Sequence, residues 1–182
     1  MGSAIGMIEY QTVSSGMYAA DTVVKTADVE IIEAQTVCPG KYIMIFSGEI
    51  SAVAACVDAA KNIAGEKMIN SFVLGNPHES VIPAIYGAGE VNEAKALGVL
   101  ETYDASTIIV AADAAAKTSM VELIELRVAR GMCGKSYMLL TGEIAAVSAA
   151  IEKAKEEAGG AGMFLDSSVI ANPDKKLWQA IL

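Results

Sequence analysis

The sequence has no long hydrophobic run and no cluster of basic residues, although 53% of its 182 residues are hydrophobic. Because no stretch of about eighteen uncharged apolar residues occurs, we expect no membrane span. The net charge is −9 with scattered acidic residues, which argues against nucleic acid as a partner. The first ten residues lack a basic segment and are typical of a strand, so we expect no signal peptide.

Cysteine is scarce, with only Cys38, Cys56 and Cys133. An odd number of cysteines in a chain without a secretory signal is typical of reduced thiols rather than of a disulfide framework. We therefore expect a soluble, cytoplasmic protein. Cys56 follows Val53 by one helical turn and precedes Val57, so it is expected in a hydrophobic core.

Catalytic motifs are also missing. The sequence has no glycine-rich phosphate loop, no serine nucleophile elbow and no pair of cysteines two residues apart. His78 is the only histidine, and one imidazole makes neither a catalytic triad nor a metal site within one chain. We expect that the protein is not an enzyme.

What the sequence does contain is an internal repeat. The segment Ala4–Glu9 reappears as Ala96–Glu101, and Ala19–Thr26 matches Ala111–Thr118. Further matches pair Gly40-Lys41 with Gly134-Lys135, Gly48–Ile50 with Gly142–Ile144, and Asn76-Pro77 with Asn172-Pro173. We predict two copies of one domain of roughly ninety residues, at 1–86 and 96–182, joined by a linker at 87–95.

Each copy predicts the same order of elements. In the first, strands are expected at 4–13, 29–37, 42–46 and 68–74. A helix is expected from a Ser14 or Ser15 cap to Thr26, another over 49–64 ended by Gly65, and a short one starting at Pro77. The order is βαββαβ plus a terminal helix, a ferredoxin-like α+β fold that forms an α/β sandwich.

A short turn carries the first cysteine. It reads TVCPGK over Thr36–Lys41 and lies between two apolar predicted strands. Pro39 fixes its own φ and restricts Cys38, while Gly40 permits backbone angles that other residues avoid. Such a turn holds the thiol at the rim of a sheet. A structural or incidental thiol is the alternative, since free cysteine often behaves as a small hydrophobe.

These repeated motifs resemble the tandem-domain shell proteins of bacterial microcompartments. The shared features are the AIGMIE opening, the AAD segment followed by a lysine on the first helix, the GK turn, the GEI helix start and the NPH segment. Both copies run in the unpermuted order. The TVCPGK turn is most similar to trimeric members with an iron–sulfur cluster on their threefold axis.

The resemblance implies a homotrimer of six BMC domains, a pseudo-hexamer with a central pore, in a microcompartment shell. Three Cys38 thiolates would meet on the axis as ligands of a 4Fe-4S cluster, with electron relay or another redox function across the shell. The implied partners are other shell proteins and a redox enzyme. The pore would be lined by Cys38, Pro39, Gly40, Lys41, Met132, Cys133, Gly134 and Lys135.

Other residues of the repeat have more than one interpretation. Cys133 could add a second ring of thiols, but the family pattern does not require it, and we expect a non-ligand. Lys25 and Lys117 match the family's edge lysine, or are solvated partners of acids one helical turn earlier. Glu9 and Glu101 are equivalent, so strand-end or interdomain contacts explain them better than acid–base catalysis.

Two further points concern charge and the oligomer edge. Lys41, Lys135 and Arg130 beside the turns are expected to place positive charge near the pore and to favour anions. Asn76 and Asn172 replace an arginine that is usual at this point of the family motif, which puts that edge contact in doubt.

Two other functions stay open on the sequence alone. One is a shell trimer without a cluster, whose pore passes metabolites or cofactors. The other is a small-molecule sensor, because the ferredoxin-like fold has many unrelated functions.

Overall fold

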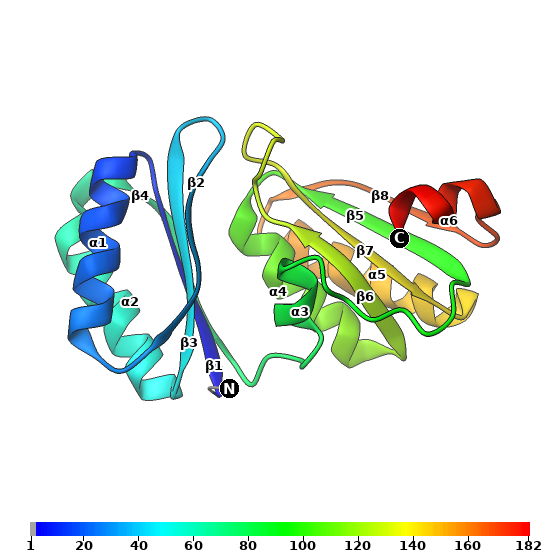
Figure 1. The fold of residues 1–182 in the computed structure, drawn as a ribbon, viewed down its shortest axis with the longest axis horizontal. Helices are drawn as coiled ribbons and strands as arrows, with labels where there is room; N and C mark the ends of the chain where they lie inside the picture. The colour runs from blue at the N-terminus through cyan, green and yellow to red at the C-terminus, as the bar shows by residue number, and fades with distance from the viewer. Residues whose placement is uncertain (1–2) are drawn as a thin grey trace. The chain divides into compact units, whose positions relative to one another are not determined.

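A computed structural model describes residues 3–182 of the chain, apart from the side chain of Ala64 (Figure 1). It divides into two compact units, Met1–Pro77 and His78–Leu182. Among the described residues, no helix combines the length and apolar character needed to cross a membrane.

The first unit follows the predicted βαββαβ order. Its elements are β1 (Ala4–Tyr10), α1 (Val13–Thr26), β2 (Glu30–Val37), β3 (Lys41–Gly48), α2 (Ile50–Ala64), the 3-10 turn η1 (Gly65–Lys67) and β4 (Met68–Gly75). The sheet order is β2-β3-β1-β4 and every pairing is antiparallel. This order confirms the ferredoxin-like prediction.

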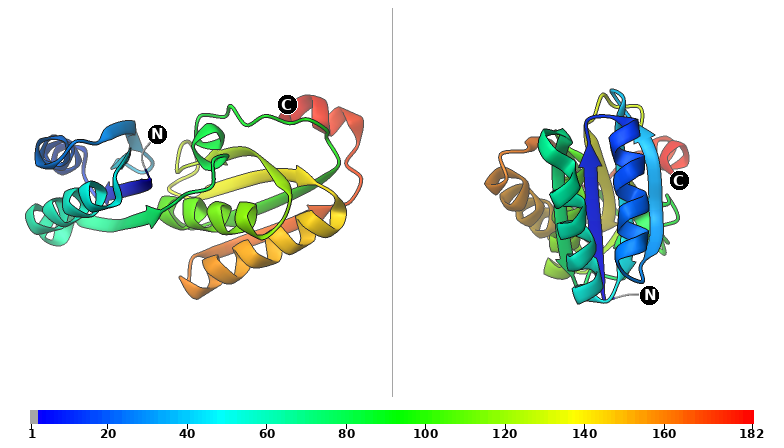
Figure 2. Two further views of the ribbon diagram at one scale, coloured as in Figure 1. Left: turned by 90° about the horizontal axis from the view of Figure 1, so that it is seen from below. Right: turned by 90° about the vertical axis from the view of Figure 1, so that its left-hand side faces the viewer.

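Two helices cover one face of this sheet. Figure 2 shows α1 and α2 side by side over the strands. Alternate residues of β1, including Ile8 and Tyr10, point into this core with Phe46 of β3 and Val53 of α2. Cys56 also lies in the core and is fully buried, which confirms its expected place.

The second unit repeats the arrangement with an added helix at each end. Its elements are α3 (Val81–Ile85), β5 (Ala96–Thr102), α4 (Ala105–Thr118), β6 (Val121–Arg127), β7 (Ser136–Gly142), α5 (Ile144–Gly160), β8 (Phe164–Ile170) and α6 (Lys175–Ile181). The antiparallel sheet has the order β6-β7-β5-β8. The two units therefore share one topology, as the repeat predicts.

A small second cluster covers the other face of this sheet. Trp178 of α6 packs against Leu97 of β5 and Ile124 of β6. Figure 2 shows α6 on the side of the sheet opposite α5. The sheet of the second unit is thus covered by apolar side chains on both faces.

Several predicted boundaries were wrong. The first strand ends at Tyr10, and α1 begins at Val13 with Thr12 at its N-cap position, so neither Ser14 nor Ser15 is the cap. Pro77 does not begin a helix, because α3 begins at Val81 after two turn residues. In contrast, Gly65 does end α2, with a positive φ of 53°.

The short helix α3 belongs to the second compact unit, whereas the sequence-based boundary placed residues 78–86 in the first domain. Its apolar side chains, such as Val81 and Ile85, are buried, and α3 packs against α4 and β6. The linker also follows β6 closely. A Cβ at Gly89 would lie 2.2 Å from the carbonyl oxygen of Leu123, so only glycine fits there.

Candidate metal-binding and pore turns

The first candidate turn joins β2 to β3 and has Cys38 at its tip. The amide of Gly40 donates a hydrogen bond of 2.9 Å to the carbonyl of Val37, which closes a four-residue turn with a cis Cys38–Pro39 peptide bond. Gly40 has a φ of 98°, a conformation that favours glycine. Pro39 and Gly40 are exposed and Cys38 is half-buried. The sequence correctly placed this thiol at the rim of a sheet.

A buried ion pair lies at the base of this turn. Lys41 Nζ pairs with Glu9 Oε1, and the Glu9 side chain is fully buried while that of Lys41 is 17% exposed. Among the described residues, the second oxygen of Glu9 accepts no hydrogen bond. The sequence did not predict this pair, because Glu9 and Lys41 are far apart in the chain and meet only through the pairing of β1 with β3.

The second candidate turn joins β6 to β7 and is longer. Its backbone has positive φ at Ala129, Gly131, Cys133 and Gly134, and the amide of Lys135 donates to the carbonyl of Met132 at 3.1 Å. Cys133 is exposed and Met132 is half-buried. This loop and the Cys38 turn belong to different units.

One chain does not assemble a metal site within its described residues. No three His, Cys, Asp or Glu side chains there are placed to hold a metal ion together. At the first turn a single chain supplies one thiol, and Cys56 is a core residue. A cluster on Cys38 would therefore need thiolates from further chains.

Burial raises the pKa of the Cys56 thiol above its ordinary value. This thiol also donates a hydrogen bond of 3.2 Å to the carbonyl of Val23. A neutral, hydrogen-bonded thiol inside a helix–sheet core is a poor metal ligand.

The two repeated lysines differ in their surroundings. Lys25 pairs with Asp21 at 2.6 Å, and both side chains are largely exposed. Lys117 pairs with Asp113 at 2.7 Å, but Asp113 is buried and also accepts the main-chain amide of His78 at 2.7 Å. The predicted pairing with an acid one helical turn earlier is confirmed in both copies, and only in the second copy is the acid buried.

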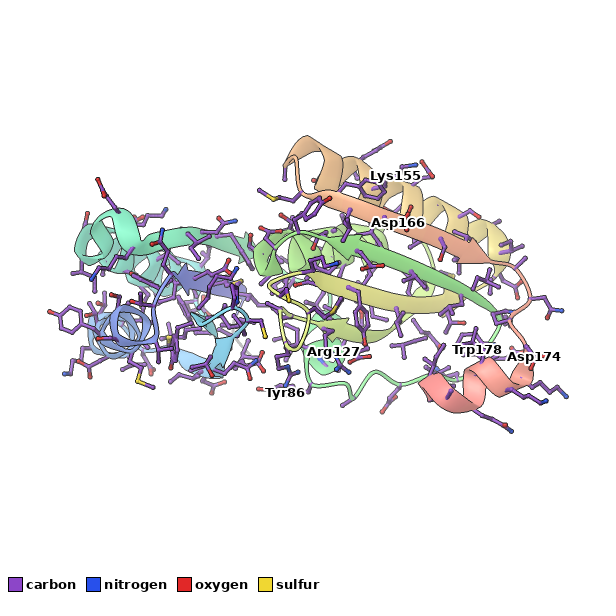
Figure 3. The ribbon with its side chains drawn as sticks, turned by 90° about the horizontal axis from the view of Figure 1, so that it is seen from above. Tyr86, Arg127, Lys155, Asp166, Asp174 and Trp178 are labelled. Atoms are coloured by element: carbon purple, nitrogen blue, oxygen red, sulfur yellow. The ribbon has the colours of Figure 1, made fainter. Side chains whose placement is uncertain are left out.

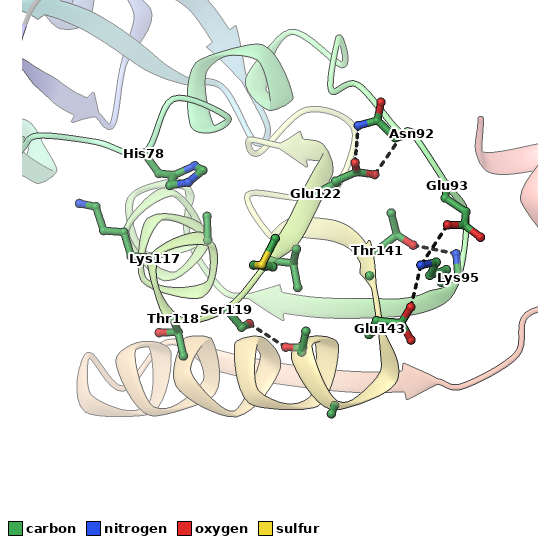
Figure 4. Close-up of a pocket in the computed structure, with 16 residues that line it drawn as sticks. His78, Asn92, Glu93, Lys95, Lys117, Thr118, Ser119, Glu122, Thr141 and Glu143 are labelled. Carbon is green, nitrogen blue, oxygen red and sulfur yellow. Dashed lines mark hydrogen bonds and ion pairs between the residues drawn. The ribbon is translucent and has the colours of Figure 1, made fainter.

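Lys117 and His78 also border a cavity of about 1010 Å³ in the second unit (Figure 4). The imidazole of His78 lies 2.8 Å from the hydroxyl of Ser80, and Lys95 binds Glu93 and Glu143 at 2.9 and 2.6 Å. The hydrogen bonds of Lys95 with Glu143 and, to a lesser extent, with Glu93 raise the pKa of Lys95 despite its exposure. Lys95 is thus paired with two acids of the lining, whereas the partner of Lys117 is Asp113, outside it.

A further polar cluster on β6 and β7 was not predicted. Glu125 accepts hydrogen bonds from Arg127 Nε at 2.8 Å and from the Tyr137 hydroxyl at 2.8 Å. The rarity of arginine was a usable signal for this cluster, because Arg127 is one of only two arginines in the sequence.

The BMC domain matches the chain twice, over residues 4–77 and 96–173. This chain belongs to the BMC-domain family. Each match covers the βαββαβ part of one unit, from its first strand to the end of its last strand.

This BMC-domain protein is similar over its whole length to known relatives. The microcompartment shell protein PduT of Citrobacter freundii is 36% identical over 182 residues, which cover 100% of this chain and 99% of PduT. The carboxysome shell protein CcmK2 of Thermosynechococcus vestitus is 33% identical over 93 residues, which cover 47% of this chain and 91% of CcmK2. A single-domain relative therefore spans about one copy of the repeat.

A solved structure agrees with this assignment. The crystal structure of a microcompartment protein from Desulfitobacterium hafniense has a TM-score of 0.92 and 39% identity, and covers 98% of this chain and 99% of its own. The protein is therefore a structural shell protein of bacterial microcompartments, of the PduT type. Shell proteins of this family are structural, which confirms the predicted non-enzymatic role.

Proposed function

We propose that three copies of this shell protein form a flat homotrimer, a pseudo-hexamer of six BMC domains around a central pore. The support is the tandem, unpermuted repeat and the full-length similarity to PduT. Closed cyclic symmetry brings equivalent residues of three chains to one axis. The turns at Cys38–Lys41 and Arg130–Lys135 are the segments proposed to line the pore.

The same proposal makes Cys38 a ligand of an iron–sulfur cluster on the axis. The observation that carries it is the half-buried thiol at the tip of a tight β2–β3 turn, beside exposed Pro39 and Gly40. Because one chain offers one such thiol, three chains are needed to supply three thiolates. A 4Fe-4S cluster held in this way leaves one iron for water or another donor.

When bound, the cluster would supply one-electron transfer at the shell. The protein's own part is positional, since the turn fixes the thiol at the rim of the sheet and the Glu9–Lys41 pair anchors the first residue of β3. Lateral partners would be other shell proteins, with Lys25 and Lys117 at the edge contacts. A redox enzyme would exchange electrons with the cluster.

Charge near the proposed pore differs between the copies. The ammonium of Lys41 is committed to Glu9. Among the described residues, Lys135 has no carboxylate at ion-pair distance. Lys135 is therefore the lysine proposed to attract anions at the pore.

Iron and acid-labile sulfide content, with electron paramagnetic resonance, tests the cluster. The samples are anaerobically purified protein, its Cys38→Ser variant and a matched Cys133→Ser control. We expect about one cluster per three chains in the parent and in Cys133→Ser, and none in Cys38→Ser. Iron that survives the loss of Cys38 would contradict the assignment. A trimer without iron after reconstitution would instead favour a cluster-free pore.

A further inference from the structure

Apolar side chains of α1 and β2 are exposed in the first unit, whereas their equivalents in the second unit are buried. Met17 stands two residues before the repeated Ala-Ala-Asp segment, where α4 has Ile109. Ile31 of β2 and Leu123 of β6 hold the same register against the neighbouring strand. Met17 and Ile31 are 55% and 51% exposed, but Ile109 and Leu123 are buried. We call the exposed set the α1–β2 face; it consists of Met17, Tyr18, Val24 and Ile31.

In the second unit the segment around α3 occupies the equivalent position. Helix α3 packs against α4 and β6, and its side chains Val81 and Ile82 are buried. A polar contact adds to this packing, because the main-chain amide of His78 donates to Oδ1 of Asp113 at 2.7 Å. The other oxygen of Asp113 pairs with Lys117. Apolar packing and one hydrogen bond to a paired carboxylate thus hold α3 in place.

The C-terminal segment of the chain is the repeat equivalent of this α3 segment. The dipeptide Asn-Pro precedes both His78 and Asp174. The local structure agrees with this equivalence. The side chain of His78 accepts the amide of Ser80 at 3.3 Å. That of Asp174 accepts the amide of Lys176, also two residues later, at 2.8 Å.

Helix α6 uses only part of its surface within its own unit. Trp178 packs against Leu97 of the sheet. Figure 3 labels Trp178 together with Asp174, which lies at the start of α6. Leu177 is 40% exposed, whereas the equivalent Val81 of α3 is fully buried. The C-terminal segment therefore has an uncovered apolar side chain, as the α1–β2 face does.

The charges of these two surfaces are complementary. Helix α6 begins with the exposed Lys175 and Lys176. Around the α1–β2 face lie the exposed acids Asp21, Asp28 and Glu30. Opposite charges on two surfaces favour their association with each other and fix their register.

We infer that the α1–β2 face binds the C-terminal segment of a second copy of this chain, with the amide of the partner's Asp174 donating to Asp21. This contact repeats between chains the one that the α3 segment makes within the second unit. Asp21 pairs with Lys25 as Asp113 pairs with Lys117, but among the described residues Asp21 accepts no main-chain amide. A head-to-tail contact of this kind closes into a ring. The inference rests on the proposed trimer and adds which surfaces of neighbouring chains meet.

Cross-linking through introduced cysteines tests the contact. Lys25→Cys and Asp174→Cys are combined in a full-length chain that also carries Cys38→Ser and Cys133→Ser, and a short bismaleimide is added. We expect covalent dimers and trimers on a denaturing gel. Two chains that each carry only one of the introduced cysteines should form a covalent dimer when mixed, and each alone should not.

The second unit supplies a calibration pair for this experiment. His78→Cys and Lys117→Cys replace the equivalent residues, which border one cavity in the second unit (Figure 4). We expect this pair to be linked within one chain by the same reagent, which leaves a monomer on the gel with one added reagent mass.

A surface substitution tests the apolar part of the contact. Met17→Asp should raise the protein concentration at which half of the chains are trimeric at least about tenfold, because it places a charge in the α1–β2 face. Ile50→Asp is the matched control, since Ile50 is equally exposed but lies on α2, outside this face. Circular dichroism checks that both variants fold.

The outcomes separate this contact from the trimer itself. A native trimer whose Lys25→Cys and Asp174→Cys pair does not link chains, while the calibration pair does link, would overturn the inference and leave the trimer standing. Equal effects of Met17→Asp and Ile50→Asp in folded proteins would also overturn it. A parent protein that stays monomeric at every concentration would overturn the proposed trimer and this contact with it.

Discussion

Lys41 and Lys135 occupy equivalent positions in the two copies, but their ammonium groups have different surroundings. Lys41 pairs with the buried carboxylate of Glu9. The equivalent pair, Lys135 with Glu101, is not formed among the described residues. A shared motif of glycine and lysine therefore has a structural role in the first copy that it lacks in the second.

Removing Lys41 should destabilise the first unit. The Lys41→Gln variant leaves Glu9 buried without its counter-ion, and we expect the free energy of unfolding to fall by about 3 kcal/mol. Lys135→Gln is the matched control and should change it by less than about 0.5 kcal/mol. Urea unfolding at one fixed protein concentration measures both. Equal effects of the two substitutions would show that the Glu9–Lys41 pair has no special role.

The three cysteines should differ in reactivity. Cys56 is fully buried, hydrogen-bonded and raised in pKa, so at pH 8 it has less thiolate than an ordinary cysteine. In iron-free folded protein we expect iodoacetamide to modify exposed Cys133 and half-buried Cys38, and to modify Cys56 only after unfolding. Peptide mass spectrometry reads each site separately. Modification of Cys56 as fast as of Cys133 in folded protein would contradict its place in the core.

The sequence was informative about these residues to different degrees. The rim position of Cys38 followed from local turn chemistry, and the core position of Cys56 followed from helical spacing. The Glu9–Lys41 pair and the Glu125–Arg127–Tyr137 cluster join residues on different strands. Their formation depends on strand register, which local spacing does not give.

At the scale of the elements, helix and sheet pack closely over a repeated glycine. A Cβ at Gly98 of β5 would lie 2.7 Å from Leu140 and 2.9 Å from Val147 and Ile151. Gly6, the equivalent residue of β1, has the same kind of surroundings, with Phe46 and Val53 within 3 Å of a built Cβ. Each long helix, α2 or α5, thus approaches its sheet where the strand has no side chain.

A methyl group at Gly98 should therefore be costly. We expect Gly98→Ala to lower the free energy of unfolding by about 1–3 kcal/mol through overpacking. In Gly159→Ala, the control in α5, nothing lies within 4 Å of the new Cβ, and a gain of up to about 1 kcal/mol is expected from helix propensity. Thermal unfolding of both variants compares them directly. A Gly98→Ala variant as stable as the parent would show that this packing can relax at no cost.

Element type and order were predictable because periodic hydrophobic patterns fix them within each copy. The ends were less predictable. Strand β1 stops three residues before the predicted Val13, since α1 already begins there. The short helix α3 was assigned to the first domain by its position in the repeat, but its buried side chains pack on α4 and β6. Tertiary packing, not local sequence, decides where it belongs.

At the scale of the whole molecule, the proposed cluster site needs residues from more than one chain. Neither unit holds three potential metal ligands together among the described residues. In the proposed trimer, threefold symmetry would bring three copies of Cys38 to one axis. Membership of the BMC family and likeness to PduT support this view of the chain as part of an assembly.

Native mass spectrometry under anaerobic conditions tests the proposed trimer and its cluster together, because it counts chains and cofactors in one particle. We predict a species of three chains with one iron–sulfur cluster, and a trimer without the cluster for Cys38→Ser. A monomer that carries iron, or a trimer whose cluster mass persists in Cys38→Ser, would contradict it.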